Sequence, residues 1–362
     1  MTSSAASHRA NNFDAFRLLG ALLVLVGHAY PLHGRPTSPG MWGSSLSTLG
    51  LIIFFSLSGY LIATSWQREP RLLPFLQKRA LRIFPALIVL TFASAFVLGP
   101  VFSQLPVREY LAHPMTWQYL SNAILAPAYS LPGVFQTVPY VGTVNGSLWS
   151  LPVEFVCYLI VPVVAFVPSR FRSGVYIALA ALFTISSSLM IAETVDVVLY
   201  SSSLAQATTV WPYFMVGAAI ASGPKMFPLR LDLALIGLIV ATLASSIQPM
   251  VGGYLWVLVI PYVVISLGSA TTRGISSAGR FGDFSYGTYL YAFPVQQVVL
   301  TVLPGLSLAT SILVTVVLTT ALAVASWHLI EKQALKLKPH RKQAAPQVIS
   351  STDQSNVRAP QA

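Results

Sequence analysis

Long apolar segments follow one another along most of this chain, separated by short polar connections. A helix that crosses a bilayer needs about 20 mostly apolar residues, and segments of roughly that length recur ten times. Only 9% of the 362 residues are charged, whereas a soluble domain carries about 25% charged residues. The sequence therefore predicts an all-α, polytopic transmembrane helix bundle. About ten spans are expected, near residues 15–31, 46–66, 84–103, 147–168, 174–192, 206–222, 231–247, 253–269, 284–303 and 308–330.

The positive charges are distributed unevenly between the two sides that such a bundle creates. If the N-terminus is cytoplasmic, ten spans place 19 of the 21 Lys and Arg residues on the cytoplasmic side, and only Arg35 and Arg108 fall outside. This excess orients membrane proteins, so both termini are predicted to be cytoplasmic. The net charge of +11 does not indicate nucleic-acid binding, because the charges separate apolar segments instead of forming one stripe.

The chain divides into three predicted parts. Residues 1–12 form a cytoplasmic N-terminal segment, and residues 13–332 form the transmembrane domain. Residues 333–362 are polar and rich in Gln, Ser, Ala and Pro, which is typical of a disordered tail. The single cysteine, Cys157, excludes an internal disulfide and a cysteine-built metal site, and no metal is expected.

Four of the large aromatic side chains in the longest outer connection, residues 104–146, are candidates for an outer aromatic surface. Aromatic residues at this level either form an interfacial belt or a rim that stacks against sugar or lipid, and both interpretations remain open. The four are Trp117, Tyr119, Tyr129 and Tyr140.

The first predicted span carries three ionisable residues, Asp14, Arg17 and His28. Asp14 and Arg17 are three residues apart and therefore neighbours on one helix face. From Arg17 to His28 a helix turns about 1,100°, or about 20° from the same face, and rises about 16 Å. Ionisable groups inside a membrane indicate function by default. The alternatives are an interfacial anchor for Asp14 and Arg17 and a packed histidine at position 28.

A basic cluster, Lys78, Arg79 and Arg82, precedes the third predicted span. Arg79 and Arg82 are again three residues apart, so they share a helix face. Such a cluster commonly marks only the cytoplasmic end of a span. Its functional interpretation is a phosphate site, because arginine binds phosphate oxygens with two parallel hydrogen bonds.

The fourth predicted span opens with Trp149 and Ser150 and places Glu154 inside the membrane. A carboxylate there is costly unless it is protonated, paired or exposed to a wet cavity. Glu154 and His28 lie at similar predicted depths, which suits general acid–base work or orientation of the imidazole tautomer. Their contact is a hypothesis, because the sequence does not place the first and fourth helices side by side. Tyr286 and Tyr289 share a face of the ninth span and are, with Trp149 and Ser150, candidate substrate-binding residues.

Six segments together resemble the integral membrane acyltransferases of the acyltransferase type 3 family. This family O-acylates surface glycans, peptidoglycan, antibiotics and lipids, and the resemblance covers about residues 13–331. The segments are FDAFRLLGALLVLVGH (13–28), FFSLSGYLI (54–62), KRALRIFPAL (78–87), SLWSLPVEFVCYLIVP (147–162), GDFSYGTYLYAFPVQQ (282–297) and HLIEK (328–332).

The resemblance implies roles for individual residues. The family's arginine–ten residues–histidine signature falls on Arg17 and His28, where the histidine is catalytic and the arginine engages acyl-CoA. Its Arg-x-x-Arg motif falls on Arg79 and Arg82, and its Ser-Leu-x-x-Glu pattern ends at Glu154. One departure concerns acceptor class, because this chain has Ala292 where many members have a histidine.

Together these features predict an O-acyltransferase of the cytoplasmic (inner) membrane. Acetyl-CoA or another acyl-CoA would be held by its phosphates at the arginines, with Lys78 beside them, and His28 would deprotonate the acceptor or carry the acyl group. Glu154 or Asp14 would support the imidazole. The expected acceptor is a hydroxyl of a glycan or glycolipid. The alternative is a transporter or flippase, whose paired inverted repeats are not evident in the sequence.

Overall fold

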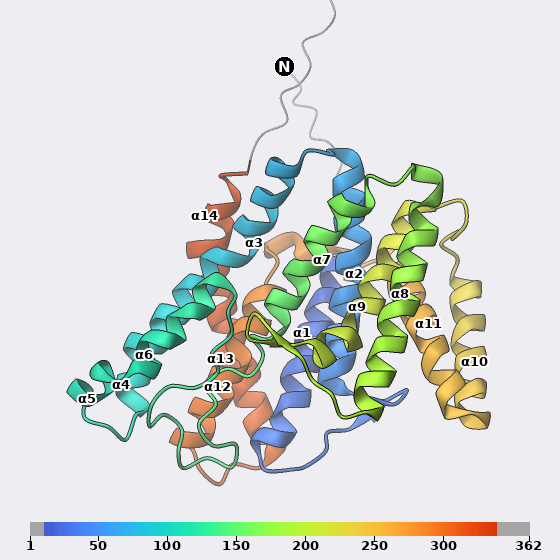
Figure 1. The fold of residues 1–362 in the computed structure, drawn as a ribbon. Helices are drawn as coiled ribbons and strands as arrows, with labels where there is room; N and C mark the ends of the chain where they lie inside the picture. The colour runs from blue at the N-terminus through green and yellow to red at the C-terminus, as the bar shows by residue number, and fades with distance from the viewer. Residues whose placement is uncertain (1–10, 339–362) are drawn as a thin grey trace, which may run out of the picture.

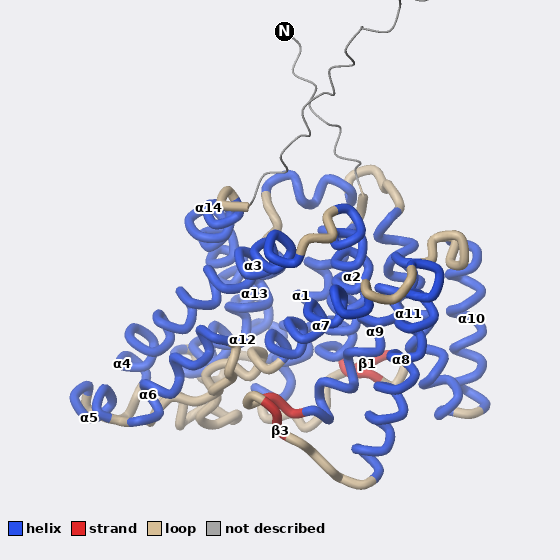
Figure 2. Tube along the Cα trace, turned by 45° about the horizontal axis from the view of Figure 1, so that its top comes forward, coloured by secondary structure: helices blue, strands red, loops and turns tan. Residues whose placement is uncertain are grey.

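The computed structural model describes residues 11–338, which form a bundle of helices with two short hairpins (Figures 1 and 2). The first long helices are α1 Phe13–Leu32, α2 Leu46–Arg68 and α3 Leu72–Ala93, which continues through the π-helical turn η1 Ser94–Leu98 into α4 Gly99–Phe102. Next come α7 Ser150–Val164, α8 Ser169–Ala192, α9 Leu204–Ser222, α10 Leu231–Ile247 and α11 Pro249–Ser269. The last are α12 Ser285–Val302 and α13 Leu308–Ser326, which continues through η4 Trp327–Glu331 into α14 Lys332–Leu335.

The remaining elements are short. The connection after α4 holds α5 Val107–Ala112, α6 Pro114–Gln118 and the 3-10 helix η2 Tyr119–Ile124, and η3 Ile275–Phe281 precedes α12. Two antiparallel hairpins pair β1 Gly40–Met41 with β2 Ser44–Ser45 and β3 Val198–Leu199 with β4 Ser202–Ser203. In the first hairpin Trp42 and Gly43 both have positive φ, as a tight two-residue turn requires.

The predicted helical fold is confirmed, and each of the ten predicted spans coincides with a helix. Within residues 11–338, six helical stretches are long and apolar enough to cross a membrane. They are residues 13–32, 46–68, 72–102, 169–192, 249–269 and 308–335. Two further apolar helices, α7 and α10, are shorter, with 15 and 17 residues. A membrane setting is therefore indicated, while the count of ten spans stays a prediction.

Two predicted boundaries differ from the structure. Helix α3 begins at Leu72, about three turns before the predicted start near residue 84, and Pro85 lies inside it. Hydropathy excluded the basic residues before Pro85, but backbone hydrogen bonding does not depend on it. At the other end helix extends to Leu335, three residues into the predicted tail. Most of that tail, residues 339–362, and residues 1–10 of the predicted N-terminal segment lie outside the described residues.

Alternate helix ends meet on one side of the bundle. The side chain of Asn12, at the start of α1, donates to the carbonyl of Leu267 at the end of α11 over 3.0 Å. Gln67, at the end of α2, donates to the carbonyl of Ala221 at the end of α9. Figure 1 shows the α2–α3 connection on one side and the loop after α1 on the other. We call these sides the Arg17 end, where α1 begins, and the His28 end, where α1 finishes.

Helix α2 lies at the centre because small residues allow close approach. A Cβ atom on Gly59 would lie 2.0 Å from the carbonyl oxygen of Phe214 in α9, and one on Gly217 would lie 2.3 Å from that of Ser56. Small residues at such crossings let membrane helices pack by van der Waals contact. The segment around Ser56 and Gly59 is therefore a close packing face between α2 and α9.

The connection between α4 and α7 folds into a second hydrophobic cluster at the His28 end. Tyr119 is fully buried there, so its predicted place in an aromatic belt or rim is wrong. Its ring packs inside the connection because α6 and η2 turn it inward. Gln297 of α12 anchors the same connection by donating to the carbonyls of Tyr140 and Thr143 at 2.8 and 2.7 Å.

Candidate active site

A cavity of about 120 Å³ lies between α1, α2, α3, α7 and α12. Its wall is apolar on the α2 side, through residues such as Leu51 and Phe55, and polar where the other helices meet it. Seven of the eleven predicted site residues line it, although they come from four separate segments. They are Arg17, Arg79, Arg82, Ser150, Glu154, Tyr286 and Tyr289.

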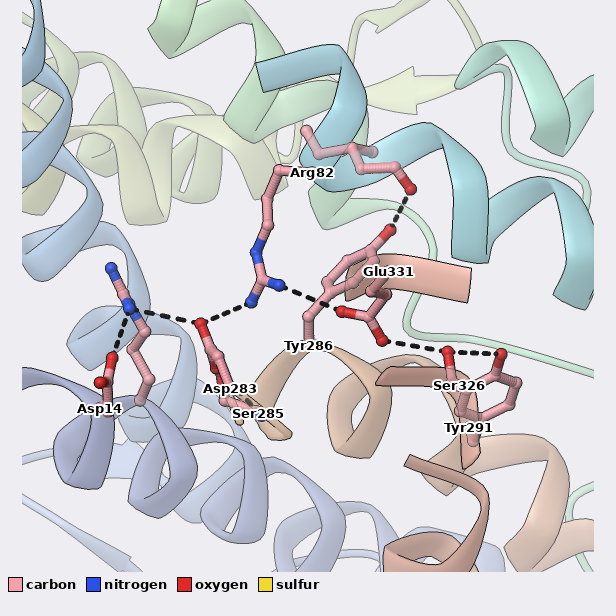
Figure 3. Close-up of polar contacts among 10 residues, drawn as sticks. Asp14, Arg82, Asp283, Ser285, Tyr286, Tyr291, Ser326 and Glu331 are labelled. Carbon is pink, nitrogen blue, oxygen red and sulfur yellow. Dashed lines mark hydrogen bonds and ion pairs between the residues drawn. The ribbon is translucent and has the colours of Figure 1, made fainter. Parts of the chain in front are cut away.

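An ion-pair network that includes the cavity residues Arg17 and Arg82 lies at the Arg17 end of the bundle (Figure 3). Arg17 Nη1 lies 2.8 Å from Asp14 Oδ1 and 3.4 Å from Asp283 Oδ2. The same Asp283 oxygen accepts from Arg82 Nη2 at 2.7 Å. Arg82 Nη1 lies 3.1 Å from Glu331 Oε2. The network thereby joins α1, α3, the entrance of α12 and the end of α13.

Asp283 is the centre of this network. Its second oxygen, Oδ1, accepts from the backbone N–H and the hydroxyl of Ser285. Burial raises the pKa of Asp283, but the guanidinium groups of Arg82 and Arg17 outweigh it and lower the pKa to about 2. The carboxylate is therefore ionised under ordinary conditions.

Asp283 and Glu331 were not assigned roles from the sequence. Both belong to segments that the resemblance matched, and Glu331 is only 2% exposed. A signal existed, because a carboxylate at or inside an apolar span is costly unless it is paired. What the sequence does not give is the partner, which lies 201 residues away for Asp283 and 249 residues away for Glu331.

Arg79 differs from its neighbour Arg82. It lines the same cavity, yet its Nε is buried and has no hydrogen-bond partner within residues 11–338. Its ion-forming neighbours include Glu154 and Arg17, but no ion pair of Arg79 occurs within that range. A cation that faces a cavity without a partner can accept an anion there.

Glu154 faces the cavity and is held by two hydroxyl groups. Ser58 Oγ and Tyr158 OH each donate to its Oε1 at 2.7 Å. The hypothesised contact with His28 is not found, since no hydrogen bond joins these two residues in the described chain. Neither Ser58 nor Tyr158 was singled out from the sequence.

Tyr289 marks the boundary of the cavity toward the His28 end. Its hydroxyl donates to the carbonyl of Ser147 at 2.7 Å and lies 2.5 Å from Ser150 Oγ. Its ring meets Phe54 edge to face, with 5.7 Å between centroids. Tyr286, one turn earlier on α12, instead donates to the carbonyl of Ile83 at 2.8 Å. These contacts fix α12 against α3 and the start of α7.

His28 lies beyond that boundary and is not part of the cavity lining. Its ring packs edge to face on Phe293 of α12, with 5.4 Å between centroids, so it faces a neighbouring helix. Nδ1 is buried and has no hydrogen-bond partner within residues 11–338. Close by, Gln296 donates to the carbonyl of Leu25 at 2.7 Å, which ties α12 to α1 at this level.

Three other predicted residues stand outside the cavity. Asp14 pairs with Arg17. Lys78 bonds to Glu69 in the α2–α3 connection, and the hydrogen bonds from Lys78 and Arg71 lower the pKa of Glu69 to about 2. Trp149 packs on the main core at the start of α7.

Comparison with known proteins shows which family the chain resembles. A family model described as an acyltransferase domain matches residues 11–329. An "O-acetyl transferase" of Shigella phage Sf6 is 33% identical over 338 residues, which cover 91% of this chain and 97% of that protein. "Nodulation protein 10" of Rhizobium leguminosarum bv. viciae is 29% identical over 363 residues, covering 92% of this chain and 95% of its own. No solved structure matches the chain.

The chain therefore belongs to the acyltransferase type 3 family, as the sequence motifs predicted. The match includes α1 to α13 and thus every helix that lines the cavity. It ends two residues before Glu331, so the last ion pair of the network lies just outside it.

Proposed function

We propose that this protein is a membrane O-acyltransferase that moves an acyl group, most simply acetyl, from cytosolic acyl-CoA to a hydroxyl of a cell-surface glycan or glycolipid. The observation that carries the proposal is one cavity lined by both Arg79, a guanidinium without an ion pair in residues 11–338, and Glu154, a hydrogen-bonded carboxylate, with His28 beyond its Tyr289 boundary. Membership of the family and the similarity to an O-acetyl transferase support it.

The proposed topology has ten spans with both termini in the cytoplasm and the protein in the cytoplasmic membrane. It rests on the 19 of 21 Lys and Arg residues that this arrangement places on one side. The Arg17 end would then face the cytosol, where acyl-CoA is made, and the His28 end would face the acceptor.

Coenzyme A fits the polar character of this site. Its phosphates suit a guanidinium without a protein partner, and its long arm suits the distance of about 16 Å that α1 rises between Arg17 and His28. The cavity ends at Tyr289 and Phe54, so the thioester arm must pass this pair of rings to reach His28.

The chemistry at His28 would be acyl transfer. An unprotonated ring nitrogen accepts the proton of the acceptor hydroxyl while its oxygen attacks the thioester carbon. The carbon–sulfur bond breaks, the thiolate of coenzyme A leaves, and it takes up a proton. Nδ1 of His28 lacks a hydrogen-bond partner in the described chain, as an atom reserved for substrate would.

A transfer assay tests the proposal. Purified protein in bilayer nanodiscs is given labelled acetyl-CoA and an extracted glycan or glycolipid, and label in the acceptor is measured. We expect transfer by the wild type and at least a hundredfold loss in His28→Ala, the order expected for a general base. His328→Ala is the matched control, because His328 is exposed on η4.

Two outcomes contradict the proposal in different ways. Full transfer by His28→Ala removes the assigned catalytic residue but leaves the activity. Movement of a solute across vesicles by the wild type, without coenzyme A and without transfer, would instead indicate a transporter.

A further inference from the structure

Arg82 lines the cavity, but two carboxylates and two aromatic rings already surround its guanidinium. Its two terminal nitrogens bond to Glu331 at 3.1 Å and to Asp283 at 2.7 Å. Its guanidinium carbon lies 5.4 Å from the ring centroid of Tyr286 and 6.0 Å from that of Trp327. Two carboxylates beside the guanidinium also repel a phosphate, so this arginine holds helices together instead of binding a ligand.

Arg79 has the opposite surroundings although it lies only three residues earlier on α3. Its side chain lines the cavity, and its Nε is buried without a partner in the described chain. Glu154, a carboxylate that lines the same cavity, is already hydrogen-bonded to Ser58 and Tyr158. A buried cation without a partner is costly. An anion entering the cavity would remove that cost.

A second cation without a partner lies beside Arg79. Lys338 follows α14, which packs against α3 at the Arg17 end (Figure 1). Lys338 is half-buried, and no ion pair of its ammonium occurs within residues 11–338. Burial and the nearby charges of Arg79, Arg82 and Lys78 lower the pKa of Lys338. Cations crowded in this way are stabilised by a bound anion.

We propose that Arg79 and Lys338 bind the phosphate groups of the donor, whereas Arg82 is a structural residue held by Asp283 and Glu331. The inference rests on the proposed acyl-CoA donor. It adds a residue, Lys338, that lies beyond the end of the family match at residue 329. It also gives the two arginines of the Arg-x-x-Arg motif different roles, because Arg79 binds the donor and Arg82 holds helices together.

Titration calorimetry with coenzyme A on the full chain in nanodiscs tests this division. Arg79→Gln is expected to raise the Kd for coenzyme A by about tenfold or more, the order for loss of one charge-assisted hydrogen bond. Lys338→Gln is expected to raise it by at least about threefold, a smaller effect because solvent screens the charge of this half-buried lysine more strongly. Inorganic pyrophosphate should compete with coenzyme A in the wild type and compete less well in both variants.

Matched variants separate binding from folding and from general electrostatics. Lys336→Gln removes an exposed lysine whose Nζ bonds to Gln333, and its Kd should stay within about twofold of wild type. Arg82→Gln should lower the melting temperature while the protein that remains folded keeps its Kd. If Arg82→Gln does not fold, Arg82→Lys supplies the same comparison.

Three results would overturn the inference. If Arg79→Gln and Lys338→Gln both leave the Kd for coenzyme A unchanged, neither residue binds the donor, although acyl-CoA can still be the donor. An equal effect of Lys336→Gln and Lys338→Gln would reduce Lys338 to general surface charge. A wild type that transfers acyl groups but binds no coenzyme A would overturn the donor itself, and with it this assignment.

Discussion

The two ends of the bundle hold polar groups of different kinds. At the Arg17 end the polar groups are charged, and Arg17, Arg82, Asp283 and Glu331 bond to one another. At the His28 end the buried polar groups are neutral, and several of them have no partner in the described chain. These include His28 Nδ1, Ser147 Oγ, Gln296 Oε1 and Gln297 Oε1.

This difference matches the two proposed substrates. An anionic donor needs fixed cations, and cations inside a membrane protein need carboxylates that hold them in place. A neutral hydroxyl needs only hydrogen-bond partners, so unsatisfied neutral atoms are enough at the other end. The arrangement therefore separates a charged binding site from an uncharged reaction site along one pair of helices, α1 and α12.

The largest expected effect comes from removing the central carboxylate of the ion-pair network at the Arg17 end. Asp283→Asn leaves Arg17 and Arg82 without their shared carboxylate, and loss of one partner of a buried pair costs about 3 kcal/mol or more. We expect a large fall in melting temperature in nanodiscs. Gln296→Leu is the comparison at the neutral end and should cost about 1 kcal/mol, since it removes one neutral hydrogen bond. Equal losses would contradict the contrast between the ends.

A smaller effect is expected from replacing Ser58, and Ser56 on the same helix serves as the comparison. Ser58 and Ser56 lie on α2, but Ser58 donates to Glu154 in the cavity, whereas Ser56 donates to the carbonyl of Ile52 in its own helix. Ser58→Ala should lower the rate of transfer by about tenfold, because a hydrogen bond to a charged group is lost. Ser56→Ala should change it by less than about threefold. The measurement is initial rate at saturating donor, and a larger loss in Ser56→Ala would refute the assignment.

The sequence predicted the helices well because length and hydropathy are local properties. Seven of the residues that it singled out line the cavity, among them Arg17 and Glu154 as ionisable groups in apolar segments and Arg79 from a basic cluster. It could not predict which groups pair. Asp283 and Glu331 reach their partners only through the packing of α12 and α13 on α1 and α3.

The misplaced expectations have the same origin. His28 and Glu154 were predicted at similar depths, and their contact was a hypothesis, because depth along a helix does not fix which helix faces are neighbours. In the structure Phe293 fills the space beside His28, and Ser58 reaches Glu154 first. The start of α3 was placed too late because hydropathy ignores helical residues that carry charge, Arg79 and Arg82 among them.

The smallest effect concerns pH and tests whether the charged end depends on Asp283 alone. Its pKa is lowered to about 2, below the ordinary value of about 3.9, so its ionised form stabilises the fold above about pH 4 and this stabilisation is lost as the pH falls toward 2. The ionisation part of the stability difference between wild type and Asp283→Asn should therefore change by under about 0.1 kcal/mol from pH 8 to 5 and fall by about half near pH 3. Melting curves of both proteins at each pH measure it. Glu69, whose pKa is also lowered to about 2, contributes equally to both proteins, so subtracting one stability from the other removes its contribution. If the stability difference already shrinks between pH 7 and 5, Asp283 is not ionised as the network requires.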